Sequence, residues 1–119
     1  MLAPAGGRLL FVAGQTARDA TGVVEPADFV TQFGRALANV LEVVRAAGGG
    51  PEDIGRLTIY VTDRRAYLDA LKPLGVEYRR LMGRHYPAMA LVEVTALVDP
   101  HAVVEIEATA VVDSTRPDR

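Results

Sequence analysis

The first half of the chain contains one short apolar run followed by one long periodic pattern. The run RLLFVA (8–13) is rich in large apolar side chains and is closed by Gly14 and Gln15, which predicts a strand. From Pro26, which suits the first position of a helix, apolar residues recur at intervals of four and three up to about Ala47. The residues of this helical stripe are Phe29, Phe33, Leu37, Val40 and Val44.

A second strand and a divided helix are predicted next. The run RLTIYVT (56–62) is β-branched and aromatic, which is typical of a strand, and one further helical turn is expected just before it. Asp63 is a good N-cap for the helix that follows. Because proline disrupts a helix interior, Pro73 is expected to divide this helix into segments 64–71 and 73–82.

Two more strands complete the predicted fold. They are expected at 89–98 and 102–112, so the order of elements is β-α-β-α-β-β. The simplest packing is a mixed sheet with two helices on one face, an α/β fold of the α+β kind. We expect a single domain at residues 1–112 and a flexible C-terminal tail at 113–119.

The last predicted strand has two different faces. In VVEIEATAVV, Glu105, Glu107 and Thr109 alternate with small and branched apolar residues, which suit packing against helices. Val103 and Val111 flank the acids on their own face. Two interpretations stay open: this face is partly buried against another subunit, or it is exposed to solvent.

The chain has few of the residue types that catalytic sites commonly use. It has no Cys, and its only Ser, Ser114, lies in the tail, so neither a thiolate nor a Ser–His pair has a candidate. Lys72 is the only Lys, in an exposed setting that does not suit a Schiff base. His85 and His101 are expected to be solvated loop residues, too few for a dedicated metal site. We expect neither metal nor cofactor.

The overall composition is that of a soluble globular protein. Of the 119 residues 50% are hydrophobic and 24% are charged. A net charge of −2 and scattered arginines give no surface suited to nucleic acid or to an anionic membrane. No apolar run reaches the ~20 residues of a membrane span, and the N-terminus lacks the features of a signal peptide. We therefore expect a cytoplasmic protein.

Four segments resemble the YjgF/Rid family of reactive intermediate deaminases in order and spacing. They are LLFVAGQTARDATG, QFGRALANVLEVVRAAGGGPEDIGRLTIYVTD, YPAM and VEIEATAV, and the resemblance covers about residues 8–112. It implies a chorismate-mutase-like fold assembled as a homotrimer, with the sheets lining a central barrel and ligand sites in three clefts between subunits. Family members hydrolyse imines and enamines such as 2-aminoacrylate to ketoacids and ammonia. Others have been described as ribonucleases or translation inhibitors.

The sequence departs from the family pattern at the implied cleft. Met89 stands where deaminating members have an arginine that binds the substrate carboxylate. Ala13 replaces the serine that precedes Gly-Gln, and Gly75 replaces the asparagine of the N-x-x-Y motif that ends at Tyr78. The family's first strand and its site aromatic are expected to be missing, or shortened to the segment 1–7.

The resemblance also implies the remaining site residues. Glu105 matches the glutamate that orients or activates the hydrolytic water, so it is the expected catalytic residue. The expected substrate-binding residues are Gly14, Gly75, Met89, Ala90 and Leu91. Arg84, close to the YPAM turn, is considered as a replacement for the missing arginine, against the plainer interpretation of a solvated loop residue.

These residues favour one function over two others. The favoured one is a divergent hydrolytic deaminase that acts on a small reactive imine or enamine, or a related neutral metabolite, in an inter-subunit cleft. With Met89 in place of arginine, we expect weak or absent activity on 2-aminoacrylate-type acids and a preference for neutral or more apolar ligands. The alternative is a non-catalytic trimeric binding or regulatory protein. A ribonuclease is disfavoured because the chain is acidic and lacks a basic, aromatic surface.

Overall fold

The structure, a computed structural model, describes residues 1–113. Its elements are β1 (Arg8–Gln15), α1 (Phe29–Ala46), β2 (Ile54–Val61), α2 (Arg64–Asp69), α3 (Leu71–Met82), β3 (Ala88–Glu93) and β4 (Val104–Val112). The predicted order β-α-β-α-β-β is confirmed, and the expected turn before β2 is a 3-10 helix at Pro51–Asp53. Residues 114–119 of the predicted tail lie outside the described residues.

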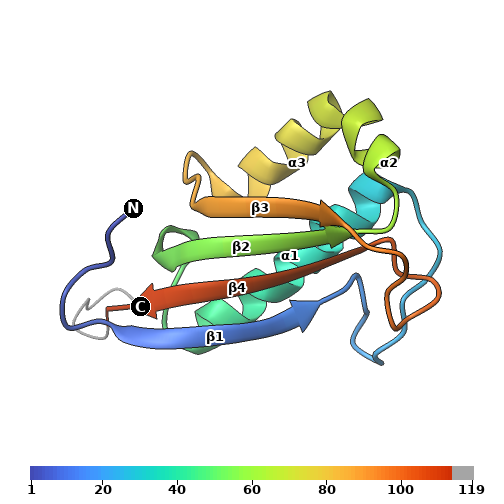
Figure 1. Cartoon of the computed structure of the whole chain (residues 1–119). Coiled ribbons are helices and arrows are strands. Elements are labelled where there is room, and N and C mark those ends of the chain that lie inside the picture. The colour runs from blue at the N-terminus through green and yellow to red at the C-terminus, as the bar shows by residue number, and fades with distance from the viewer. Residues whose placement is uncertain (114–119) are drawn as a thin grey trace.

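The strands form one mixed sheet in the order β1-β4-β2-β3. β4 is antiparallel to both of its neighbours, whereas β3 is parallel to β2. Because parallel neighbours need a crossover, the chain passes through α2 and α3 between β2 and β3. Figure 1 shows α1 crossing behind the sheet and α3 at its β3 edge, while the face toward the viewer carries no helix. The predicted fold class is confirmed.

α1 covers the sheet through the apolar stripe that its sequence predicts. All five stripe residues are buried and belong to the core cluster with side chains of β2 and β4. Full burial of one such aliphatic or aromatic side chain is worth roughly 1.5–3 kcal/mol. The helix begins at Phe29 and not at Pro26, because the Asp28 carboxylate accepts a hydrogen bond from the N–H of Thr31 at 2.8 Å and caps the helix there.

The break between α2 and α3 falls at Ala70 and not at Pro73 as predicted. Pro73 lies in the first turn of α3, where the backbone N–H groups have no partner within the helix. A proline there removes no helical hydrogen bond, so Pro73 is accommodated near the start of α3 and does not divide the helix. Asp63 caps α2 as predicted, accepting a hydrogen bond from the N–H of Arg65 at 2.9 Å.

Both C-terminal strands are shorter than predicted. β3 ends at Glu93 and not at residue 98, because its register partner Val61 is the last residue of β2. β4 begins at Val104 and not at residue 102, again opposite Val61. An apolar run extends as a strand only while a neighbouring strand can pair with it, and β2 ends there to enter α2.

The two faces of β4 differ as the alternation predicts. Its even-numbered residues from Val104 to Val112 are buried, whereas Glu105 and Glu107 are half-buried on the opposite face, here called the open face. On the same face, the β1 side chains of Leu9 and Phe11 are 59% and 73% exposed. The open face therefore combines carboxylates with large uncovered apolar side chains.

Candidate functional site

Glu105 and Gly14, the predicted catalytic residue and one predicted ligand-binding residue, lie side by side on the open face. The register of β1 on β4 shifts between Val12 and Gln15, and Gly14 lies within this irregularity. A Cβ atom added at Gly14 would collide with the Glu105 carboxylate. A glycine at position 14 therefore allows the carboxylate to lie against the β1 backbone.

A hydrogen-bonded pair lies next to Glu105. Tyr60, the register partner of Glu105 on β2, donates its hydroxyl to Glu107 Oε1 at 2.7 Å. This hydrogen bond is the main cause that raises the pKa of Tyr60, and loss of solvent and the charges of Glu107 and Glu105 add to it. Tyr60 therefore stays a neutral donor that holds Glu107. Among the described side chains, none donates a hydrogen bond to Glu105.

Met89 lines a different cavity, a groove of about 410 Å³ between α3 and the edge strand β3. We call it the α3–β3 groove. Its walls are largely apolar and aromatic and include Leu71, Gly75, Tyr78, Tyr86, Met89 and Leu91. Three of the five predicted substrate-binding residues, Gly75, Met89 and Leu91, thus meet in one cavity.

A buried tyrosine supports the aromatic wall of this groove. Tyr78 donates its hydroxyl to the carbonyl of His85 at 2.7 Å, and its ring stacks on Tyr86 with centroids 5.3 Å apart. Burial, with a smaller effect of Tyr86, raises the pKa of Tyr78 to about 12. His85 is half-buried, with Nε2 2.7 Å from the Ile54 carbonyl oxygen. The prediction of a solvated loop residue was wrong for His85, which instead holds the turn that leads to Met89.

Within one chain, Glu105 and Met89 do not share a cleft. The side chains of Met89 and Leu91 point to the helix-covered face, because their register partners in β2 belong to the core. Ala90 points to the open face, where Glu105 and Gly14 lie. The predicted site residues thus form two groups, one on each side of the sheet.

Arg79 is a groove residue that the sequence analysis did not single out. It lines the α3–β3 groove, whereas Arg84, the arginine considered from sequence, does not. A signal was present, because Leu71, Gly75 and Arg79 are spaced four apart and so lie along one stripe of α3. Arg79 Nη1 lies 3.7 Å from the position that a Cβ on Gly75 would take, so the guanidinium folds back over the gap left by the glycine.

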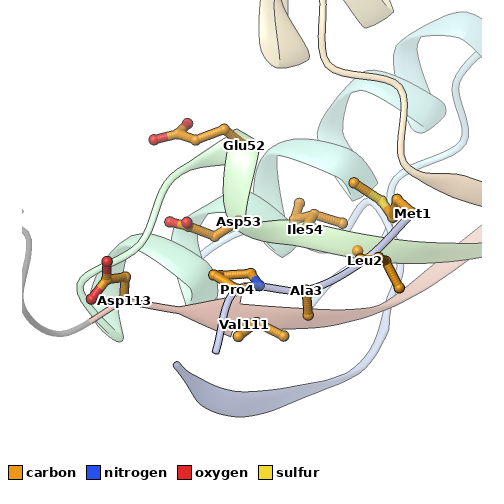
Figure 2. Close-up of a pocket in the computed structure, with 10 residues that line it drawn as sticks. Met1, Leu2, Ala3, Pro4, Glu52, Asp53, Ile54, Val111 and Asp113 are labelled. Carbon is orange, nitrogen blue, oxygen red and sulfur yellow. The ribbon is translucent and has the colours of Figure 1, made fainter. Parts of the chain in front are cut away.

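A further cavity lies at the N-terminal segment. Figure 2 shows residues 1–4 passing close to the start of β2 and the end of β4, beside Glu52 and Val111. The carboxylates at this cavity, including Asp53 and Asp113, already take part in other interactions. None of the predicted site residues lines it.

The described residues were also compared with what a metal site and a membrane-spanning helix require. Across residues 1–113, no three or more His, Asp or Glu side chains gather in a way that could hold a metal ion. Over the same residues, the helices lack the length and apolar character needed to cross a membrane.

Comparison with known proteins places the chain in a family. The family model described as endoribonuclease L-PSP matches residues 3–112. A 2-iminobutanoate/2-iminopropanoate deaminase of Capra hircus is 30% identical over 105 residues, which cover 87% of this chain and 73% of the relative. The chain belongs to this family, which is the YjgF/Rid family that its motifs predict.

Solved structures share the fold. A Rid-family protein of Yersinia pestis, YyfB, has a TM-score of 0.78 and 37% identity, covering 91% of this chain and 81% of that chain. TdcF of E. coli, solved with bound serine, has a TM-score of 0.74 and 31% identity, covering 93% of this chain and 85% of that chain. Both are similar to this chain over nearly its whole length.

Proposed function

We propose that the protein is a hydrolytic deaminase that converts a small reactive imine or enamine to a carbonyl compound and ammonia. Family membership and the deaminase name of the Capra hircus relative support this reaction class. The observation that carries the proposal is Glu105, whose carboxylate lies against Gly14 with no hydrogen bond from a described side chain. Such a carboxylate is available to take a proton from water.

The reaction needs one general base and one water. Glu105 takes a proton from the water as its oxygen forms a bond to the carbon of the protonated imine, which gives an amino alcohol. The protonated Glu105 then gives this proton to the amine nitrogen. The C–N bond breaks as the hydroxyl loses its proton to Glu105, and this proton leaves with the ammonia. An enamine enters the same path after tautomerising to the imine.

We further propose that a second copy of the chain completes the site, in a homotrimer. Glu105 and Met89 lie on opposite faces of one sheet, so a ligand contacts both only if they come from different chains. The exposed Leu9 and Phe11, which share the open face with Glu105, favour such packing, because covering apolar area stabilises an assembly by about 25 cal/mol per Å². So does the outer edge of β3, which has no partner strand within residues 1–113.

Replacement of Glu105 tests the chemistry. Glu105→Gln keeps the size of the side chain but removes the base, so ammonia release from an imine formed in the assay by an amino acid oxidase should fall by about 10²-fold or more. Glu93→Gln is the matched control, because Glu93 accepts a hydrogen bond from the N–H of Arg64 at 2.8 Å and a glutamine oxygen can accept it too. Equal rates for wild type and Glu105→Gln would contradict the proposal.

A non-catalytic small-molecule-binding protein is the second candidate. The α3–β3 groove favours it, because the groove is formed by one chain and lies away from the face that carries Glu105. On this alternative, wild type binds ligand but does not accelerate ammonia release. A ribonuclease is not proposed, despite the description of the family model, because a net charge of −2 gives little attraction for a phosphate backbone.

A further inference from the structure

Among the described residues that line the α3–β3 groove, Arg79 alone carries a charge. We propose that Arg79 binds a carboxylate of the ligand, and that the groove takes a small acid with an apolar or aromatic side group. This inference rests on the proposed function and names the substrate class of the same site. It replaces the neutral ligand that the sequence suggests when Met89 is considered alone.

The guanidinium of Arg79 is available for a ligand. The carboxylates on α2 and α3 are otherwise engaged, because Glu77 pairs with Arg80 and Asp69 lies 3.9 Å from Arg65. Within residues 1–113, no carboxylate lies within ion-pair distance of Arg79. An arginine offers parallel N–H groups that match the two oxygens of a carboxylate, so an unpaired one beside an apolar groove is suited to bind an acid.

Gly75 makes room for this contact. One turn of α3 separates Gly75 from Arg79, and the guanidinium lies over the place where another residue would carry a side chain. Along the i, i+4 row Leu71–Gly75–Arg79, α3 therefore has no side chain at position 75, while Leu74 and Tyr78 line the groove beside this gap. A carboxylate in the groove can approach the guanidinium through this gap.

The rest of the groove suits an apolar or aromatic group. The Met89 side chain is 45% exposed, and the exposed ring of Tyr86 is held in place by stacking on Tyr78. A methionine thioether is flexible and makes favourable contacts with aromatic rings. With Leu71 and Leu91, these side chains give an adaptable apolar surface next to one cation. The groove should therefore bind an arylalkyl acid more tightly than a very small acid, and more tightly than a neutral apolar molecule.

Binding of a matched pair of probes tests the inference on the full chain. The probes are 3-phenylpropanoate and its neutral amide, 3-phenylpropanamide, titrated calorimetrically into wild type and variants. Wild type should bind the acid about tenfold more tightly than the amide, as expected for one charge-assisted contact. Arg79→Gln should weaken the acid about tenfold and leave the amide unchanged. Arg79→Lys should give an intermediate loss, because lysine keeps the charge without the planar fork.

Arg84→Gln is the control, because Arg84 is exposed, lies outside the groove and changes the net charge by the same amount. Equal weakening of the acid by Arg79→Gln and Arg84→Gln would overturn the inference, since net charge would then explain the effect. Equal binding of acid and amide to wild type, or no binding of either, would also overturn it. These binding results can be told apart from the results of the Glu105→Gln assay. If the acid binds through Arg79 but no ammonia is released, only the proposed function is refuted.

Discussion

The helix-covered face and the open face of the same sheet are built in different ways. On the covered face, α1 and α3 bury nearly every apolar side chain, including Leu37, Leu57 and Ile106. On the open face, Phe11 stays exposed next to half-buried carboxylates. The first face is complete within one chain, whereas the second leaves apolar side chains and carboxylates uncovered, and it is there that we propose a second chain packs. The stability of the fold and the proposed catalytic chemistry therefore belong to different faces.

The largest expected effect is the loss of stability when a large side chain is truncated on the covered face, compared with the same truncation on the open face. Leu37→Ala removes a fully buried side chain from the core and should lower the free energy of unfolding by about 2–5 kcal/mol. Phe11→Ala should lower the melting temperature only when chains are assembled, because Phe11 has few neighbours in an isolated chain. Thermal melts over a range of protein concentrations check this contrast. A Phe11→Ala loss that does not depend on concentration would break it.

The next effect concerns the open face alone. Gly14→Ala should displace the Glu105 carboxylate and lower the rate of ammonia release by on the order of 10²-fold, because small misplacements of catalytic groups are costly. Gly55→Ala is the matched control on β2, since the nearest atom to an added Cβ is the Thr109 carbonyl oxygen at 3.8 Å. Full activity of Gly14→Ala would show that the position of Glu105 does not matter.

The smallest expected effect is the loss of unfolding free energy when one tyrosine hydroxyl is removed, either at the groove or on the open face. Tyr78→Phe should cost about 1 kcal/mol of unfolding free energy near pH 8, because it leaves the carbonyl of the half-buried His85 without its donor. Tyr60→Phe should cost less, because its hydrogen bond to Glu107 lies on the open face.

The Tyr78 effect should also depend on pH. Its pKa is about 12 in the folded chain and near 10 when unfolded, so the native state favours the neutral phenol. The stability that Tyr78 contributes is therefore fully present below pH 10 and is lost as the pH rises from about 10 toward 12. Urea unfolding of wild type and Tyr78→Phe at pH 8 and pH 11 should show the gap between them narrowing. A gap of constant size would contradict the assignment.

Most of the fold could be predicted from the sequence because local patterns carry it. The helical stripe of α1, the alternation along β4 and the Asp63 cap each depend on residues close together in the chain. The errors fall where a distant partner decides. β3 ends at Glu93 because its partner β2 ends, and no local pattern records where a neighbouring strand stops.

The sequence by itself determined the family, the order of elements and the identity of Glu105, Gly14 and Met89 as the residues to examine. Only the tertiary structure decided that Glu105 and Met89 lie on opposite faces, because the face of each side chain depends on the register between strands. It also decided that Arg79, and not Arg84, lines the groove beside Met89. An arginine has the same chemistry anywhere in a sequence, but its availability depends on which carboxylates and which gaps the fold places around it.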